Sequence, residues 1–189
     1  MQRLLEGYEI EGKVLTAADY GVPQIRKRAI LIGASGGRRV MFPQRTHFRP
    51  VREHSKIKNE WKAVKEVLLP SGEADESLFY SKKLIKGFKR RERINKNRGI
   101  GFRWQFLNPE KPSYTIPARY YKDGANALVK YSDKKIRMLD VKECAKIQSF
   151  PNDYIFSGST MQIYKQIGNA VPPLMCYNIA KAITTVMKT

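Results

Sequence analysis

A short unbroken apolar run, Ala29-Ile30-Leu31-Ile32-Gly33, most constrains what this chain can fold into. Such a run is typical of a β-strand that is covered on both faces. A strand of that kind needs neighbouring strands and helices. The one companion nearby is Tyr8 to Val14, where apolar residues mostly alternate with polar ones. Two strands cannot supply that cover, so we expect this segment to complete a larger sheet that comes from elsewhere.

The middle of the chain reads as a second, smaller domain. Residues 34–58 look like a loop, and Asn59 is placed to cap a helix from Glu60 to about Leu69 that Pro70 stops. A further helix is predicted to start at Ser77. Residues 89–133 show short strand-like pieces separated by glycine and proline.

The C-terminal third is predicted to be helical. Asp140 followed three residues later by Glu143 makes a capping box for a helix that ends near Gln148. A second helix starts at Ser159 and is closed by Gly168, because glycine is the usual residue at a helix C-terminus. A third helix follows Asn169, with prolines tolerated in its first turn.

The charge is strongly positive and unevenly spread. Lys and Arg number 36 and Asp and Glu 17 in the 189 residues, which gives a formal net charge of +19. Between Lys82 and Arg103 ten basic residues face one acid, Glu92, and aromatic residues lie among them. Basic side chains neutralise phosphates and aromatic rings stack on bases, so nucleic-acid contact is favoured over a merely solvated face.

Composition excludes several other classes of protein. No apolar run approaches the length of a membrane-spanning helix, and the N-terminus has no signal-peptide core. Two cysteines cannot build a disulfide framework, so a reducing cytoplasm is expected. Two histidines are too few for a His/Cys metal cluster, and we predict no metal.

Three short blocks could carry chemistry. In the first, Gln24, Arg26 and Arg28 would point the same way if they lie on a strand, and could grip a carbonyl oxygen or a phosphate. The bland alternative is a basic strand start that faces solvent. The second block, Arg137 to Pro151, reads as a structural helix in which Cys144 is an inert core residue.

The third block is Gln166 to Pro173. A glycine ends one helix and Asn169 opens the next, so free backbone N–H groups and the Asn169 amide would face one spot. Such a helix N-terminus suits a carboxylate or another anion. A simple capped corner between two helices is the plainer alternative.

Taken together and in this order, the three blocks resemble the C-terminal half of the C5-cytosine DNA methyltransferases. The first is similar to the family's Gln-x-Arg-x-Arg block. The second resembles its Arg-x-Leu-x-x-x-Glu-x-x-x-x-Gln-x-Phe-Pro block, and the third its Gly-Asn-(Ala/Ser)-Val block. The family inserts a target recognition domain between the first two, with a Thr-(Leu/Ile) pair that Thr115-Ile116 resembles.

The resemblance implies an α/β fold made of two parts. Two strands and C-terminal helices would complete a partner's S-adenosylmethionine-dependent, Rossmann-like methyltransferase domain. A small, irregular, strand-rich target recognition domain would lie between them. The expected domains are residues 1–58 with the Gln-x-Arg-x-Arg block, 59–135 for recognition, and 136–189, whose last helix packs back on the catalytic domain.

Other family blocks are absent from the sequence. It has no Pro-Cys dipeptide, no Glu-Asn-Val block and no glycine-rich S-adenosylmethionine loop after a first strand. It begins where a full-length enzyme would be in the helix before the first block. We therefore expect the smaller subunit of a split enzyme, inactive alone. A larger subunit would carry the Pro-Cys nucleophile and most of the cofactor site.

The resemblance also assigns roles to residues. Arg28 would bind the carbonyl oxygen of a flipped cytosine, Arg26 would sit beside the nucleophile, and Gln24 would order the flipped strand. Asn169 and Ala170 would lie at the amino-acid end of S-adenosylmethionine. The predicted contacts to double-stranded DNA, to phosphates and to bases, are Lys89, Arg90, Arg91, Arg93, Arg98, Arg103, Thr115, Ile116 and Arg119.

The predicted function is thus part of a bacterial, nucleoid-associated cytosine-5 DNA methyltransferase of a restriction-modification system. Two alternatives remain open. The chain could be the C-terminal fragment of a single-chain enzyme, or a non-enzymatic, sequence-specific DNA-binding module. The hypothesis of an RNA-binding protein is weakened because the sequence contains no RNA-binding motif.

Overall fold

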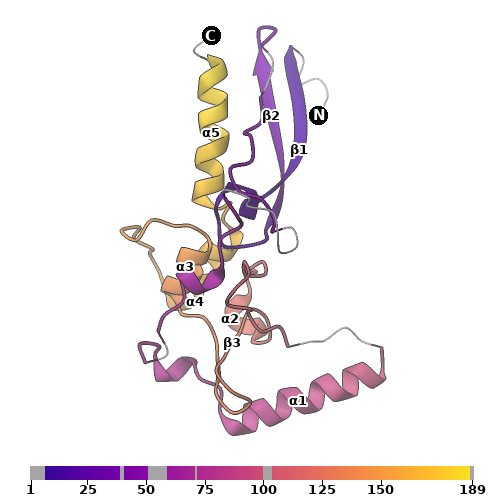
Figure 1. The fold of residues 1–189 in the computed structure, drawn as a ribbon, viewed down its shortest axis with the longest axis vertical. Helices are drawn as coiled ribbons and strands as arrows, with labels where there is room; N and C mark the ends of the chain where they lie inside the picture. The colour runs from indigo at the N-terminus through magenta and orange to yellow at the C-terminus, as the bar shows by residue number, and fades with distance from the viewer. Residues whose placement is uncertain (1–6, 39–40, 51–58, 71, 100–103, 188–189) are drawn as a thin grey trace.

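The structure is a computed structural model, and it describes residues 7–38, 41–50, 59–70, 72–99 and 104–187. Figure 1 shows three regions stacked along the long axis. Two strands stand beside a long helix at one end, short helices and loops form the middle, and a single helix extends across the other end.

Both expected strands are present and are longer than predicted. Strand β1 (Tyr8–Thr16) pairs antiparallel with β2 (Lys27–Ser35), in a register that runs from Tyr8 opposite Ser35 to Thr16 opposite Lys27. A 3-10 helix (Ala17–Tyr20) begins the connection. It ends at Gly21, whose φ of 81° lies in the left-handed region that glycine adopts without strain.

One face of this strand pair is covered and the other is open. Helix α5 (Pro173–Met187) stands beside the strands, and Ile30 packs in one core with Met175 and Ile179 from α5. Because side chains alternate between faces, Leu31 and Val14 lie on the opposite face, and they are 77% and 65% exposed. The predicted second cover is therefore not supplied by the described residues.

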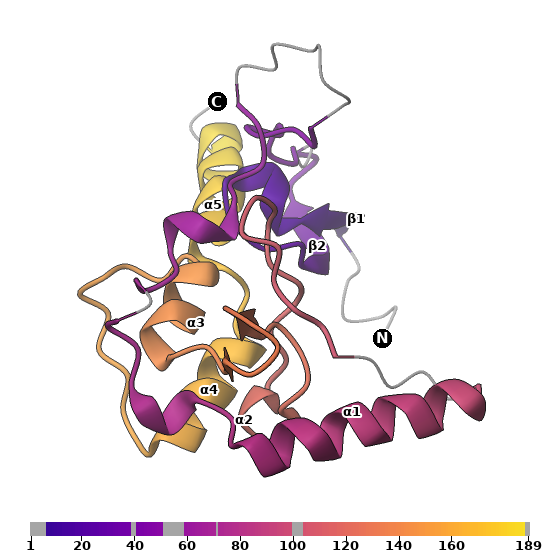
Figure 2. The same ribbon diagram turned by 60° about the horizontal axis from the view of Figure 1, so that its bottom comes forward.

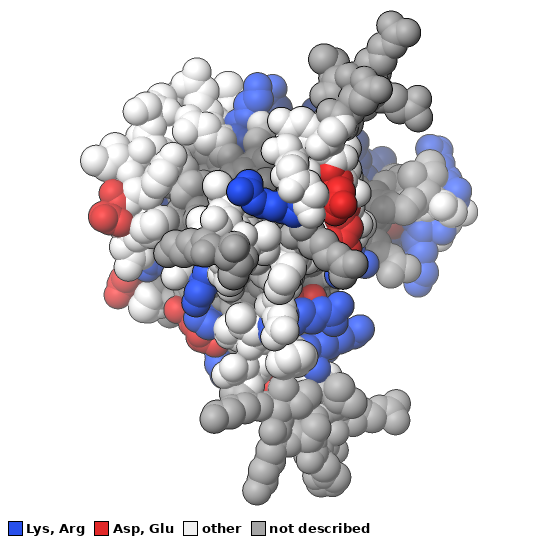
Figure 3. Space-filling view, turned by 90° about the horizontal axis from the view of Figure 1, so that it is seen from above, with Lys and Arg blue, Asp and Glu red and all other residues white. Residues whose placement is uncertain are grey.

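The open face predicts self-association of the isolated chain. It carries exposed apolar side chains on both strands. Figure 3 shows the molecule from this end, with charged residues of both signs scattered among uncharged ones. The open-face residues are Tyr8, Ile10, Val14 and Leu31. We expect concentration-dependent oligomers in sedimentation velocity, reduced by Leu31→Glu, because contiguous apolar surface drives association. A monomer with a cooperative, high-temperature melt would contradict this.

The prediction of a helix from Glu60 to Leu69 is wrong. Only a 3-10 helix forms there (Val64–Glu66), and Val64 is fully buried. The backbone N–H groups of Val64 and Lys65 donate to the carbonyls of Lys111 and Pro109, at 2.9 and 3.0 Å. These donors are therefore unavailable for α-helical bonds, and the segment is fixed to a distant loop instead.

The helix predicted from Ser77 begins later. A 3-10 helix (Glu76–Leu78) comes first, and Tyr80 N–H donates to the Ile136 carbonyl at 2.9 Å, as in a strand. Helix α1 (Lys82–Asn97) then starts after Ser81, whose hydroxyl accepts from the Leu84 N–H. It extends away from the rest of the molecule in Figure 2.

The prediction of strand-like pieces is wrong for residues 89–97, because these residues belong to helix α1. Among the described residues after α1, Phe106 forms an isolated bridge with Leu128 and Ser113 forms one with Gln24. Strand β3 (Val129–Lys130) pairs with β4 (Ile136–Arg137). Between α1 and β3 lies the short helix α2 (Tyr120–Asp123). In the described ranges the middle region, residues 59–135, is therefore irregular and contains more helix than strand.

The three predicted C-terminal helices are confirmed. Helix α3 (Val141–Ile147) has the Asp140–Glu143 capping box, and α4 (Thr160–Asn169) has a second one formed by Ser159 and Gln162. Helix α4 ends one residue beyond the predicted Gly168, and α5 starts at Pro173. Local capping chemistry sets where α3 and α4 begin.

Three apolar clusters hold the chain together. The largest joins α3 and α4 to the middle region through residues such as Ile116, Tyr120 and Tyr164. A second joins the strands to α5, and a third lies beneath α1 around Trp104 and Ile85. Helices α3 and α4 thus share a core with the middle region, while α5 packs on the strands.

Among described residues, no helix has the length and apolar character needed to span a bilayer.

Candidate functional site

The Gln-x-Arg-x-Arg segment lies where the strands meet the middle region. Ile25 N–H donates to the Ser113 carbonyl and Ser113 N–H donates to the Pro23 carbonyl, both at 2.9 Å. The Thr115 hydroxyl donates to the Ile25 carbonyl at 2.9 Å. These bonds make a short parallel bridge between Gln24 and Ser113, so two segments far apart in sequence are held as one unit.

Arg26 links the first and third sequence blocks to the Thr115-Ile116 pair. Its side chain is fully buried, Nη1 donates to the Ile116 carbonyl at 3.0 Å, and Nη2 donates to the Gly168 carbonyl at 2.6 Å. Burial, with the charge of Arg28, lowers the pKa of Arg26 to about 10, so the guanidinium stays charged at neutral pH. Arg26 is thus a brace between the strand segment, the Thr-Ile pair and the end of α4.

The end of α4 is also held by two further contacts. Gln148 Nε2 donates to the Ile167 carbonyl at 2.7 Å. Gly168 packs so closely on the 117–118 segment that an added Cβ would lie 2.5 Å from backbone atoms of Pro117 and Ala118. Sequence reasoning assigned Gly168 only a helix-closing role, because nothing local signals this close approach.

Of the two arginines in this segment, Arg28 is the one that remains partly accessible to solvent. It lies on β2 and is half-buried, its Nη1 donates to the Lys27 carbonyl at 2.8 Å, and it forms no ion pair with another described residue. The common strand face predicted for Gln24, Arg26 and Arg28 is corrected, because β2 starts only at Lys27. Arg26 and Gln24 are fully buried, and both polar atoms of the Gln24 side chain lack a partner in the described structure.

The turn between α4 and α5 differs from the predicted anion site. Asn169 is the last residue of α4 and does not open the next helix. The Ala170 N–H is not free, because it donates to the Gln166 and Ile167 carbonyls at 3.1 and 3.3 Å. The Asn169 side chain is exposed, and it lines a hollow of about 410 Å³ with Ser157 and Gln166 among its neighbours.

The predicted DNA contacts fall into three groups. Lys89, Arg90, Arg91 and Arg93 lie exposed on α1, and Arg98 is its C-cap. Thr115 and Arg119 are exposed beside the brace. Ile116 is fully buried, so its side chain has no surface to offer a base, and Arg103 lies outside the described residues.

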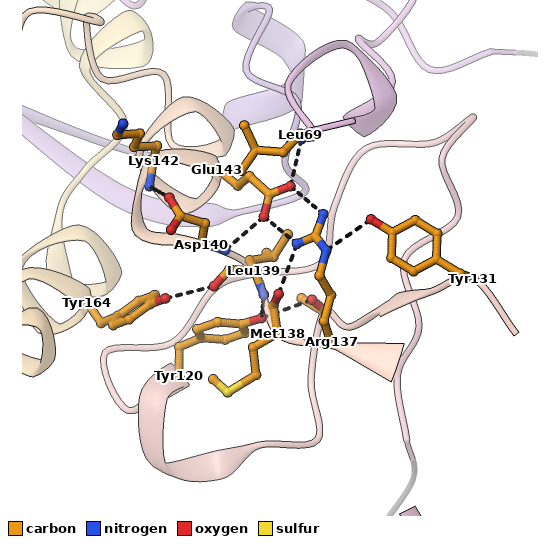
Figure 4. A network of polar contacts seen from close by, with 11 residues as sticks. Leu69, Tyr120, Tyr131, Arg137, Met138, Leu139, Asp140, Lys142, Glu143 and Tyr164 are labelled. Carbon is orange, nitrogen blue, oxygen red and sulfur yellow. Dashed lines mark hydrogen bonds and ion pairs between the residues drawn. The ribbon is translucent and has the colours of Figure 1, made fainter. Parts of the chain in front are cut away.

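The second block is a structural network, as predicted from its capping signals (Figure 4). Arg137 is fully buried and donates to both carboxylate oxygens of Glu143, at 2.6 and 2.9 Å, and to the Tyr131 hydroxyl. Burial lowers the pKa of Arg137, but the bonds to Glu143 and Tyr131 outweigh it, so the pKa is raised. Next to Glu143, burial holds the pKa of Cys144 well above its usual value, which makes this thiol inert.

Comparison with known proteins identifies the architecture. In structure, the chain resembles the Dnmt2 methyltransferase of S. pombe, with a TM-score of 0.68 at 15% identity over 99% of this chain and 60% of that one. The Entamoeba histolytica methyltransferase EhMeth gives a TM-score of 0.67 at 16% identity, over 98% of this chain and 56% of that one. At these identities the likeness shows the fold alone, which is that of methyltransferases.

In sequence, the type II methyltransferase M.NlaX of Neisseria lactamica is 34% identical over 184 residues, covering 96% of this chain and 53% of that protein. M.DsaV of Dactylococcopsis salina is 31% identical over 178 residues, covering 92% and 47%. The chain thus spans about half the length of these relatives. Residues 4–185 match the family model "C-5 cytosine-specific DNA methylase". This chain belongs to the C-5 cytosine-specific DNA methylase family.

Proposed function

We propose that the chain supplies DNA target recognition and part of the active site of a cytosine-5 DNA methyltransferase. The observation that carries this concerns the junction of the strands and the recognition region. There Arg28 remains partly accessible to solvent, while the neighbouring Arg26 is buried and bonded to the Ile116 and Gly168 carbonyls. A partner chain provides the catalytic cysteine and most of the cofactor site. The type II names of the relatives support a restriction-modification system, acting in the bacterial cytoplasm near the nucleoid.

The chemistry gives Arg28 its role. Carbon 5 of cytosine is a weak nucleophile until a thiolate adds to carbon 6, and the base must be out of the duplex for that. A guanidinium at the cytosine carbonyl oxygen stabilises the negative charge that develops there. Burial raises the pKa of both Cys144 and Cys176, so neither is a thiolate at neutral pH, which supports a nucleophile on the partner.

The cofactor site is shared in this proposal. When bound, S-adenosylmethionine supplies the methyl group. The exposed amide of Asn169 and the neighbouring polar side chains of its hollow fit the amino-acid end of that molecule, with Ala170 beside them. The hollow is open to solvent, so these residues bind and orient one end only, and the partner encloses the rest.

Reconstitution tests the proposal. The purified chain, mixed with a partner chain that carries the Pro-Cys block, is expected to transfer labelled methyl groups to DNA, whereas each chain alone is inactive. No transfer from any such mixture would count against it. Tight, sequence-selective DNA binding by the isolated chain, together with that failure, would favour a non-enzymatic DNA-binding module.

Arg28→Ala in the reconstituted enzyme is expected to lower kcat by about a hundredfold, as does loss of one donor to a developing oxyanion. Arg28 donates only to a neighbouring carbonyl, so assembly with the partner should be unchanged in size-exclusion chromatography. Arg28→Lys, which keeps the charge, serves as the matched control and should retain more turnover. Near-normal turnover of Arg28→Ala would remove Arg28 from the active site.

A fragment of a single-chain enzyme would use the same chemistry. The observation that favours this second candidate is that the relatives are about twice as long as the matched region. The reading frame upstream of the gene separates the two. A separate frame encoding the Pro-Cys block supports a split enzyme, and a continuous frame supports a fragment.

A further inference from the structure

A basic groove runs between α2 and α4, and of its lining residues only Arg119 is among the DNA contacts predicted from sequence. The two helices pack on each other, and the groove between them has a volume of about 550 Å³. Its lining contains three cations and no Asp or Glu. The lining residues are Ala118, Arg119, Tyr121, Lys122, Met161, Gln162 and Lys165.

The floor of the groove is rigid and partly apolar. Tyr121 is 52% exposed and stacks on Tyr164, with ring centroids 5.9 Å apart and an interplanar angle of 28°. Tyr164 is itself fixed, because its hydroxyl donates to the buried Leu139 carbonyl at 2.8 Å. Met161 adds a half-exposed apolar wall. Cations above a flat aromatic surface suit a sugar-phosphate chain.

The groove lies between the two surfaces already described. On one side, the Tyr80 hydroxyl donates to the Gly124 carbonyl at 2.7 Å, which fixes the start of the basic helix α1 to the end of α2. On the other side, Lys165 and Gln162 also line the hollow that contains Asn169. Figure 2 shows α2 between α4 and the start of α1.

We infer that the α2–α4 groove binds the DNA backbone, with Lys122 and Lys165 each contacting one phosphate and Tyr121 packing on a sugar. This inference rests on the proposed function for its ligand. The groove extends the row of backbone contacts from the start of α1 to the edge of the hollow that contains Asn169.

The test measures how the affinity of the full chain for a duplex DNA changes with KCl concentration, by fluorescence anisotropy. Each phosphate contact contributes about 0.9 to the slope of log affinity against log salt. Lys122→Gln with Lys165→Gln should lower the slope by about 2, and each single variant by about 1. Lys122→Arg with Lys165→Arg should keep the wild-type slope.

Lys142→Gln with Lys181→Gln is the matched control, because both lysines are exposed on other helices and the change in net charge is the same. An equal slope loss in the control and groove variants would overturn the inference. So would a slope loss seen only with duplex RNA. The measurement needs no partner and no turnover, so a groove that binds DNA can be established even if methyl transfer is not reconstituted, and the reverse also holds.

Discussion

Glu143→Ala is expected to lower the free energy of unfolding by about 3–5 kcal/mol, because it leaves the buried Arg137 charge without its partner. The guanidinium and the carboxylate are both almost completely buried and are joined by two bonds, at 2.6 and 2.9 Å. Water cannot replace the lost carboxylate at this depth. Folded domains are stable by only about 5–15 kcal/mol, so a substantial part of the chain's stability is at stake.

The carboxylate of Glu143 also satisfies two backbone donors. It accepts from the Leu69 N–H and from the Asp140 N–H, both at 2.8 Å. The first bond holds the loop that follows Val64, and the second closes the capping box of α3. Alanine would therefore loosen a loop and a helix start as well as the ion pair.

Equilibrium urea unfolding of the full chain, followed by circular dichroism, measures this cost. Glu110→Ala is the control, because the Lys65–Glu110 pair is exposed and should cost less than about 1 kcal/mol. Arg137→Met combined with Glu143→Leu should recover the part of the loss that comes from the unpaired charge, but not the part that comes from the Leu69 and Asp140 N–H groups. A cost for Glu143→Ala no greater than that for Glu110→Ala would contradict this account of the network.

The features predicted correctly from sequence depend on residues a few positions apart. The predicted helix starts at Asp140 and Ser159 each have a capping partner three residues later, and the strands are marked by alternation or by an apolar run. The segment after Asn59 carried equally good local signals, but its backbone donors bond to residues 109 and 111. Long-range bonds of that kind leave no trace in a local pattern.

The same distinction explains what was missed at the site. The residue types of the Gln-x-Arg-x-Arg block indicated its chemistry, but not which arginine is buried. Arg26 is buried because it satisfies carbonyls that lie 90 and 142 positions away in sequence. Lys122 and Lys165 are 43 positions apart, and only the packing of α2 on α4 brings them to one groove.

Gly168→Ala is expected to destabilise the chain by about 1–3 kcal/mol, although alanine normally stabilises a helix by about 1 kcal/mol relative to glycine. The new Cβ would lie 2.5 Å from the backbone of Pro117 and Ala118, which cannot rotate away as a side chain could. Separation of α4 from this segment would also displace the Gly168 carbonyl that accepts from Arg26. Methyl transfer by the reconstituted enzyme should therefore fall together with stability.

Gly87→Ala provides the matched control for this substitution. Gly87 lies inside α1, and an added Cβ there meets no atom within 4 Å, so only the helix propensity changes. Urea unfolding should show opposite signs, with Gly87→Ala more stable than the parent chain and Gly168→Ala less stable. If both substitutions stabilise the chain equally, α4 does not pack tightly on the 117–118 segment, and the contact of Arg26 with the Gly168 carbonyl would not hold α4 against the middle region.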